Sequence, residues 1–308
     1  MDNRIIFLGG SPRSGTTLLQ NMLDCHPEIL GGPEFLHLPD IVRLRNQLQG
    51  SVEKNWISLI CSSDEVDDQI RSMILNLLLP FADKHDAKYL SEKTPENVLV
   101  FSRLIELFPD AKFIHVVRDP RATIASLLSV GKKAREKGEA PAPFARNLSS
   151  AIAYVRKCLK AGFDAHAAAP EHVFNVVYED LTREPERVSR ELCDFLGVEW
   201  SESLLKPGEK SHLGEAAITV NSKEIWYDAK TYNSNPNTSS LEKWRSSLNA
   251  VQQIAIVRSF SGFDQLKQLG YQLSVNDLDT RDKITGNLIY SVGRVFTALK
   301  KRLRALVG

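Results

Sequence analysis

The first part of the chain restricts the fold more than any other segment. Residues 5–8 (IIFL) form an apolar run that predicts a buried strand, and apolar residues recur at helical spacing over 18–23. Between them lies the segment 9–17, with the sequence GGSPRSGTT. A strand that leads through such a turn into a helix predicts an anion-binding turn, because the first amides of the helix point toward it.

Short apolar runs at 88–90, 112–117 and 173–178 predict further strands. Helical patterns alternate with them, at 51–81, 98–108, 145–168, 184–196 and 251–269. Strands that are apolar throughout are buried on both faces. The sequence therefore predicts an α/β fold with a P-loop-type, doubly wound parallel sheet flanked by helices. We expect one domain over 1–275 and a basic tail over 276–308. Segment 131–144, rich in glycine, proline and charge, predicts a mobile loop.

Composition narrows the possible functions. The 308 residues have a formal net charge of +1, which gives no argument for a nucleic-acid partner. The four cysteines stand at no metal-ligand spacing, so we expect neither a disulfide framework nor a metal site. The early first strand leaves no room for a signal peptide, and no apolar run of about 20 residues could cross a membrane. We therefore expect a cytoplasmic protein.

The turn after the first strand has the spacing of a Walker A nucleotide loop but differs in one residue. Gly10 and Gly15 stand where that loop has its glycines, whereas Thr16 replaces the lysine that reaches the outer phosphates. The nearest cation is Arg13, which can form paired hydrogen bonds to phosphate or sulfate oxygens. The alternative is a tight turn that carries a surface arginine.

A second candidate anion site follows the strand at 112–117. Arg118 stands at the carboxyl end of that strand, where ligands bind in open α/β sheets. Asp119 and Pro120 predict the start of a helix, and Ser126 lies two helical turns further on the same face. Arg118 and Ser126 could therefore converge on one anion. Alternatively, Arg118 pairs with a carboxylate and Ser126 packs or faces solvent, while Arg121 is solvated or pairs with Asp119.

These patterns resemble the sulfotransferases that use 3′-phosphoadenosine 5′-phosphosulfate (PAPS). The residues PRSGTT at 12–17 and the pair Arg118 and Ser126 carry the resemblance. Weaker matches are LDCHPE at 23–28, YEDL at 178–181, CDFLG at 193–197 and LEKW at 241–244. The similarity extends over roughly residues 4–272 and is strongest to the branch with tyrosylprotein sulfotransferases and many bacterial enzymes.

The resemblance implies a set of donor-binding residues. Arg13, Ser14, Gly15, Thr16 and Thr17 would hold the 5′-phosphosulfate. Arg118 and Ser126 would hold the 3′-phosphate. Tyr178 matches a tyrosine that contacts the nucleotide, although it could be a core aromatic. Lys243 matches a lysine that closes over the donor, although it could be a solvated lysine beside a packed tryptophan.

The resemblance also implies catalytic residues. Glu34 lies 21 positions after Arg13, the family offset for the general base, although it could be a solvated loop carboxylate. Lys93 matches a lysine that stabilises charge on the bridging oxygen, and Arg13 could share that task. His26 and His37 are rival bases. His26 is better suited to a turn, and His115 is expected in the core. No metal is required by this chemistry.

The acceptor is not specified by these residues. Tyrosylprotein enzymes carry an arginine where this chain has Val130, and Lys132 or Lys133 could replace it. Segment 232–237 also differs from theirs, so the acceptor could be a glycan, a lipid-linked molecule or a peptide. The basic amphipathic pattern over 283–308 could lie on a membrane or pack on the domain.

Two other functions fit parts of the sequence. The first is a P-loop kinase-like phosphotransferase in which Asp119 binds Mg²⁺. The second is a non-catalytic nucleotide-binding protein of the same fold. The absent loop lysine argues against the kinase, and the presence of both Glu34 and Lys93 argues against the non-catalytic protein.

Overall fold

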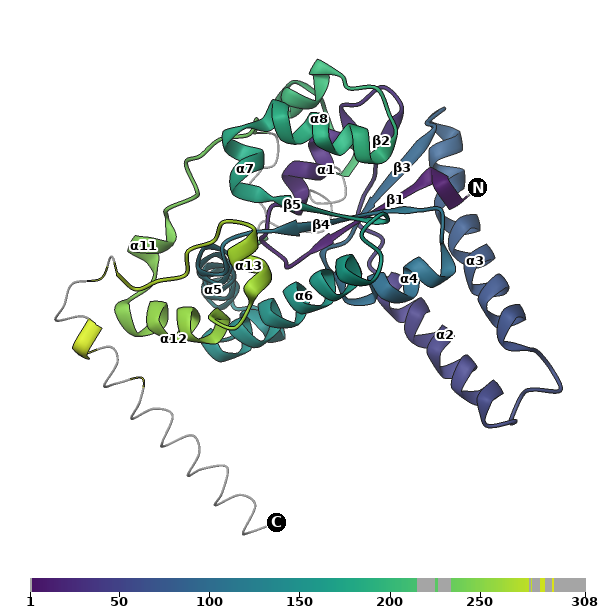
Figure 1. The fold of residues 1–308 in the computed structure, drawn as a ribbon, viewed down its shortest axis with the longest axis horizontal. Helices are drawn as coiled ribbons and strands as arrows, with labels where there is room; N and C mark the ends of the chain where they lie inside the picture. The colour runs from purple at the N-terminus through teal and green to yellow at the C-terminus, as the bar shows by residue number, and fades with distance from the viewer. Residues whose placement is uncertain are drawn as a thin grey trace, which may run out of the picture.

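A computed structural model describes residues 2–214, 225–226, 234–276, 278, 283–285 and 290. Its centre is a parallel sheet of five strands in the order β2-β3-β1-β4-β5. The strands are β1 (Ile5–Gly10), β2 (Ile29–Gly31), β3 (Tyr89–Lys93), β4 (Lys112–Val117) and β5 (Val173–Val177). The predicted α/β fold with a parallel sheet flanked by helices is confirmed (Figure 1).

Helices connect the strands and continue beyond the sheet. Those before β5 are α1 (Thr16–Asp24), α2 (Leu38–Glu53), α3 (Ser63–Lys84), α4 (Phe101–Leu107), α5 (Pro120–Glu136) and α6 (Leu148–Ala168). Those after it are α7 (Tyr178–Arg183), α8 (Pro185–Leu196), α11 (Trp244–Ser247), α12 (Ala250–Phe260) and α13 (Asp264–Gln268). Short 3₁₀ helices are η1 (Asp2–Arg4), η2 (Pro95–Val100), η3 (Pro143–Ala145), η4 (Glu202–Leu205) and η5 (Pro207–Glu209).

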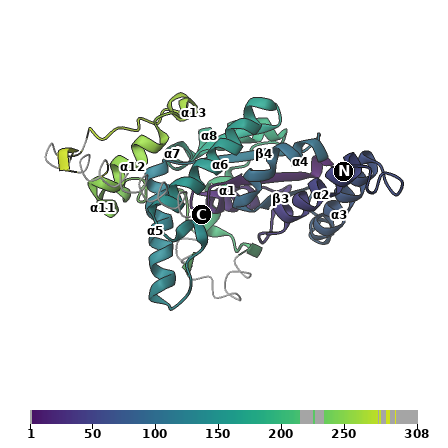
Figure 2. The same ribbon diagram turned by 90° about the horizontal axis from the view of Figure 1, so that it is seen from below.

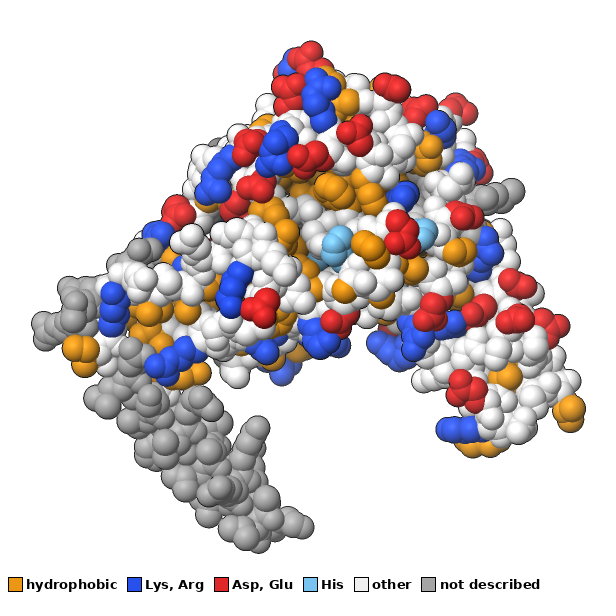
Figure 3. Space-filling view, viewed as in Figure 1, with side chains coloured by type: hydrophobic (Ala, Val, Ile, Leu, Met, Phe, Trp, Pro, Cys, Tyr) orange, Lys and Arg blue, Asp and Glu red, His pale blue; other side chains and the backbone are white. Residues whose placement is uncertain are grey.

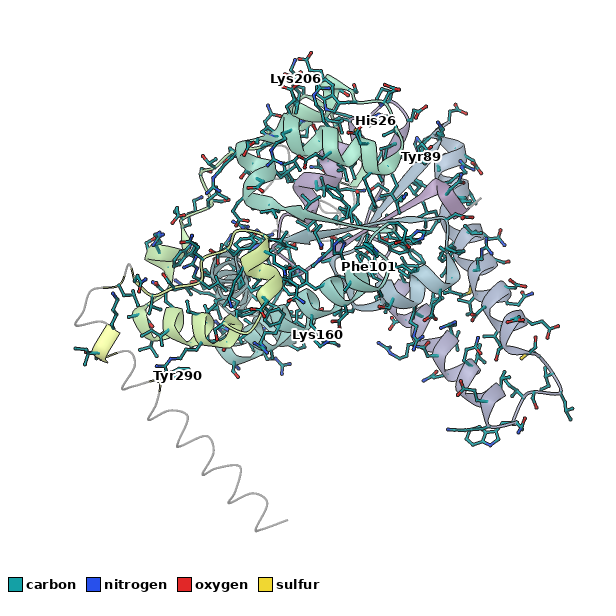
Figure 4. The ribbon with its side chains drawn as sticks, viewed as in Figure 1. His26, Tyr89, Phe101, Lys160, Lys206 and Tyr290 are labelled. Carbon is teal, nitrogen blue, oxygen red and sulfur yellow. The ribbon has the colours of Figure 1, made fainter. Side chains whose placement is uncertain are left out.

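Side chains along β1 point alternately to the two faces of the sheet, and each face is covered by a layer of helices. Ile5 and Phe7 enter a core formed with α2, α3, α4 and α6. Ile6 and Leu8 point to the other face and pack with α1 and α8. In Figure 4, Phe101 lies on the side of the sheet that α4 and α6 cover, and His26 lies on the side of α8. All strand residues of β1 are therefore buried, as the apolar run predicts.

Two helical extensions lie at opposite ends of the molecule (Figures 1 and 2). The α2–α3 hairpin projects from one end, and α11 and α12 lie at the other. At the tip of the hairpin, Trp56, Leu59 and Ile60 are exposed (Figure 3). A capping box between Ser62 and Glu65 then starts α3. The helical pattern over 51–81 is thus interrupted by this tip.

The prediction of a mobile loop over 131–144 is wrong in its first part, because α5 continues through Glu136. Gly131 has a packing role instead of breaking the helix. A Cβ atom there would lie 2.0 Å from the carbonyl oxygen of Ala145. The glycine lets α5 and the segment before α6 approach closely.

The predicted tail of 276–308 lies almost entirely outside the described residues. Its suggested contact with a membrane, through 283–308, therefore stays a prediction. Among the helices that the structure describes, none is both long and apolar enough for a bilayer crossing.

Candidate active site

A cavity of about 800 Å³ opens at the carboxyl edge of the sheet. Because the strands are parallel, β1, β3, β4 and β5 all end at this edge. The cavity is lined by most of the predicted site residues, which are Arg13, Gly15, Thr16, Thr17, Glu34, Arg118, Ser126, Tyr178 and Lys243. The fold thus brings together segments that are far apart in the sequence.

The turn between β1 and α1 has the backbone geometry that an anion-binding loop requires. Arg13 and Gly15 both have positive φ, at 72° and 104°. The amide of Ser14 donates to the carbonyl of Ser11 at 3.0 Å, and Ser14 Oγ is buried with no hydrogen-bond partner in the described part of the chain. A Cβ atom on Gly15 would lie 2.1 Å from Cδ2 of Tyr178, so this position requires glycine.

Arg118 lies against this turn. Its Nη1 donates to the carbonyl of Arg13 at 3.1 Å, and its guanidinium lies 4.3 Å from the centre of the Tyr178 ring. Nη2 donates to Oγ of Ser240 at 3.3 Å, whereas the buried Nε has no partner among the described residues. The end of β4 and the turn after β1 therefore form one continuous polar wall.

The side chain of Arg13 crosses the cavity toward α5. Its Nε donates to Oγ of Ser126 at 3.0 Å, and its Nη1 donates to the carbonyl of Trp226. Ser126 thus faces the cavity, as the helical spacing from Asp119 predicts. Lys133 also lines the cavity, two helical turns beyond Ser126 and one turn beyond Val130.

Of the two lysines considered as replacements for an arginine at position 130, only one faces the cavity. Lys132 does not line the cavity and pairs with Glu136 at 3.7 Å. Lys133 lines the cavity wall. Lys243 is exposed at the rim, next to the buried Trp244. Tyr232 and Asn233, which precede it in the divergent segment, lie outside the described residues.

Glu34 and Lys93 meet on the opposite side of the turn. Lys93 Nζ donates to Glu34 Oε1 at 2.5 Å and lies 3.5 Å from Oγ1 of Thr17. The side chains of Lys93 and Glu34 are 4% and 18% exposed, respectively. In the sheet, Lys93 is in register with Leu8, so its side chain points to the same face as α1.

Two buried glutamates outside the predicted set of site residues support segments next to the cavity. Glu92 accepts hydrogen bonds from the amide of Phe35 at 3.1 Å and from Thr94 Oγ1 at 2.7 Å. Glu179 accepts from the amide of Asp119 at 3.1 Å and from the hydroxyl of Tyr271 at 2.5 Å. Both glutamates could have been identified from the sequence, because each lies at the end of a buried strand or directly after one. Acidic residues are rarely buried at such positions unless they have partners.

Another carboxyl, Glu96, faces the cavity itself. The hydroxyl of Tyr154 donates to its Oε1 at 3.3 Å. Burial raises the pKa of Glu96, and the nearby Glu34 adds to this effect. Phe144 stacks on the ring of Tyr154 at 4.4 Å and lies near Trp226. This part of the cavity is therefore partly aromatic.

The rival bases lie elsewhere. His26 is held in a turn, where its Nε2 contacts the carbonyl of Glu199 and its Nδ1 accepts from the amide of Glu28. His37 is exposed at the start of α2. His115 is fully buried in β4 and contacts Asn175, and burial lowers its pKa to about 4. None of these three histidines lines the cavity.

Asp119, the residue that a kinase would use for Mg²⁺, is engaged by Arg121. The carboxylate caps α5 by accepting from the Arg121 amide and pairs with its Nη2 at 2.7 Å. The guanidinium also lies 4.1 Å from the Trp244 ring. These contacts give Asp119 a structural role. No group of three or more metal-binding side chains is found among the described residues.

Comparisons with known proteins agree with this architecture. A model of the Sulfotransferase family matches residues 5–202. Protein-tyrosine sulfotransferase A of Caenorhabditis elegans is 32% identical over 203 residues, which are 65% of this chain and 51% of that protein. Protein-tyrosine sulfotransferase 1 of Danio rerio is 29% identical over 282 residues, covering 89% of this chain and 74% of that protein. The chain therefore spans between about half and three quarters of the length of these relatives.

Two solved structures share the fold. The sulfotransferase domain of the Synechococcus PCC 7002 olefin synthase has a TM-score of 0.56 and 24% identity, covering 88% of this chain and 95% of that one. The sulfotransferase domain from the curacin biosynthetic pathway has a TM-score of 0.59 and 23% identity, covering 88% and 98%. Because the family model covers more than half of its residues, the chain belongs to the sulfotransferase family.

Proposed function

We propose that this protein transfers a sulfuryl group from PAPS to a hydroxyl group of an acceptor. The observation that carries the proposal is the meeting of two cationic positions in one cavity of about 800 Å³. Arg13 stands in the turn after β1 and Arg118 at the end of β4, and the Arg118 guanidinium donates to the Arg13 carbonyl. A donor with phosphate groups on both the 3′- and the 5′-oxygen of its ribose needs two such positions.

The residues in the cavity fit this donor. Arg118 lines the cavity, and its Nε is a buried polar atom without a partner in the described chain, whereas buried polar atoms are normally hydrogen-bonded. A phosphate oxygen would satisfy it. We assign the 5′-phosphosulfate to the turn of residues 13–17 and the 3′-phosphate to Arg118 and Ser126. Tyr178 and Lys243 would contact the rest of the nucleotide.

Glu34 and Lys93 are assigned to the reacting end. The bound donor supplies the activated sulfuryl group. The Glu34 carboxylate, which pairs with Lys93, would accept the proton of the acceptor hydroxyl. The Lys93 ammonium, beside Thr17, would stabilise the negative charge that develops on the leaving phosphate. Arg13 is not assigned to this task, because its guanidinium lies on the α5 side of the cavity, bonded to Ser126 and to the carbonyl of Trp226.

The acceptor would enter along the partly aromatic wall of Phe144 and Trp226. The relatives named above are protein-tyrosine sulfotransferases, which supports a peptide hydroxyl as one candidate. A glycan or a lipid-linked hydroxyl stays a further proposal. Lys133 is the side chain that we expect to reach an acidic group on the acceptor.

The test is incubation of the purified protein with ³⁵S-labelled PAPS and a cell extract, followed by separation into protein, glycan and lipid fractions. We expect label in one fraction with the wild type and almost none with Glu34→Gln. A parallel reaction with labelled ATP and Mg²⁺ tests for phosphoryl transfer. Label from ATP but not from PAPS would refute the proposal.

A further inference from the structure

Glu92 and Lys93, which are consecutive in β3, contact Phe35 and Glu34, which are consecutive in the loop between β2 and α2. Lys93 pairs with the side chain of Glu34, and Glu92 accepts a hydrogen bond from the backbone amide of Phe35 at 3.1 Å. Side chains alternate along a strand, so these two contacts lie on opposite faces of the sheet. Glu92 is in register with Phe7 and Lys93 with Leu8, which point to the two different cores.

The hydrogen-bond donors around the Glu92 side chain suit a carboxylate better than an amide. Three donors converge on it: the Phe35 amide and Thr94 Oγ1 on one oxygen, and Asn97 Nδ2 on the other. Asn97 Nδ2 is fixed as the donor because it also faces the carbonyl of Leu8 at 3.4 Å. A group that accepts at both oxygens satisfies all three donors, whereas an amide would place its NH₂ group against one of them.

Glu92 is fully buried, so this arrangement carries a cost. Burial raises its pKa to about 7 and outweighs the hydrogen bonds and the nearby Lys93 ammonium, which act in the opposite direction. Among the charged groups that the structure describes, Lys93 is the one identified as acting on it through its charge.

We infer that Glu92 is a positioning residue, which fixes the loop through the Phe35 amide and thereby sets the place of the Glu34 carboxylate beside Lys93. This inference rests on the proposed role of Glu34. Glu92 itself does not line the cavity and touches no reacting group. The ionised carboxylate is the form that holds the amide most strongly, since hydrogen bonds to a charged acceptor are about twice as strong as neutral ones.

The test compares the full-length wild type with Glu92→Gln and with Asp67→Asn. The control makes the same chemical change in the α2–α3 region, where Asp67 pairs with Arg45 at 2.6 Å. Hydrogen exchange of the Phe35 amide is measured at pH 8 and pH 6 and expressed as a protection factor. Binding of adenosine 3′,5′-bisphosphate is measured by calorimetry, and transfer from ³⁵S-labelled PAPS to a cell extract by initial rate.

At pH 8 we expect Glu92→Gln to lower protection of the Phe35 amide about tenfold and the transfer rate about tenfold, with nucleotide affinity within twofold. Asp67→Asn should leave all three unchanged. In the wild type, protection should fall several-fold from pH 8 to pH 6, and Glu92→Gln should remove this dependence.

Equal protection of Phe35 in wild type and Glu92→Gln would overturn the inference, as would an equal loss in Asp67→Asn. A normal transfer rate in Glu92→Gln despite lost protection would also overturn it. If the wild type transfers no label but the amide follows the expected pattern, the proposed function fails while the hold of Glu92 on the loop is supported.

Discussion

Lys93 Nζ and Glu34 Oε1 lie 2.5 Å apart, although the two residues are 59 positions apart in the sequence. Their side chains are 4% and 18% exposed, so little water reaches the pair. Removing one partner of such a shielded ion pair leaves an uncompensated charge, which is far more costly than losing a surface pair. The pair sits beside Thr17, at the end of the cavity where we place the transferred group.

The first prediction concerns this pair. Glu34→Gln and Lys93→Ala should each lower turnover by ~10²–10⁴-fold, since a positioned general base and a fixed cation each contribute on that scale. Affinity for adenosine 3′,5′-bisphosphate should change little in Glu34→Gln, because Glu34 is assigned to the acceptor. Transfer from labelled PAPS and calorimetry measure the two quantities.

The chain offers a matched control for this experiment. Lys88 and Glu28 form the same kind of pair at 3.2 Å, near the start of β3, but are 57% and 41% exposed. Lys88→Ala should keep full turnover, because exposed pairs contribute little. Equal turnover in wild type and Glu34→Gln would remove Glu34 from the mechanism.

The second prediction concerns selectivity for the 3′-phosphate. Arg118→Ala should weaken binding of adenosine 3′,5′-bisphosphate at least tenfold and weaken binding of adenosine 5′-phosphate much less. Hydrogen bonds to charged groups contribute about 1.5–3 kcal/mol each, which supports this magnitude. Arg103→Ala is the control, because Arg103 is exposed and pairs with Glu106, one helical turn away. An unchanged ratio of the two affinities would mean that Arg118 does not read the 3′-phosphate.

The third prediction concerns the turn after β1. Gly15→Ala combines a positive φ of 104° with a contact of 2.1 Å to the Tyr178 ring. Gly138→Ala has a positive φ of 76° and no atom within 4 Å, so it reports the backbone strain alone. Strain of this kind costs about 1–2 kcal/mol. We expect thermal unfolding to show a clearly larger loss in Gly15→Ala, together with lost nucleotide binding. Equal losses in the two variants would show that Tyr178 does not restrict the turn.

Much of the fold could be predicted because its strands are apolar throughout. The prediction for β3 stopped at residue 90, however, whereas the strand continues to Lys93. Its last residues, Ser91-Glu92-Lys93, are polar and bond to Gln20, to the amide of Phe35 and to Glu34, respectively, so this part of the strand lacks an apolar pattern. The edge strand β2 has only three residues, too few for a pattern.

The site could be predicted where its residues share one local segment. The turn of residues 13–17 and the strand-to-helix step from Arg118 to Ser126 are of this kind. Contacts that depend on distant segments could not be predicted, such as Arg13 with the carbonyl of Trp226, or Glu92 with the amide of Phe35. In both contacts the partner is a backbone group. Every residue has such groups, so the sequence does not indicate which residue will provide the contact.

The last prediction concerns the pH dependence of stability. Burial raises the pKa of Glu92 to about 7 from an ordinary value of 4.5. Between these two values the folded chain keeps a proton on Glu92 that the unfolded chain has released. The contribution of Glu92 to the free energy of unfolding therefore falls as pH rises from about 4.5 to 7, and it is constant above that range. A pKa raised this far corresponds to a loss on the order of 3 kcal/mol.

Urea unfolding of wild type and Glu92→Gln at pH 5, 6, 7 and 8 measures this contribution as a difference. Burial also raises the pKa values of Glu96 and Glu179, but these groups titrate in both proteins and cancel. The difference between the two proteins should therefore decline from pH 5 to pH 7 and then level off. A difference that does not change with pH would show that Glu92 keeps an ordinary pKa. Ionised Glu92 holds the Phe35 amide most strongly, but burial disfavours this ionised form. The expected decline therefore means that the proposed function of Glu92 costs the protein stability.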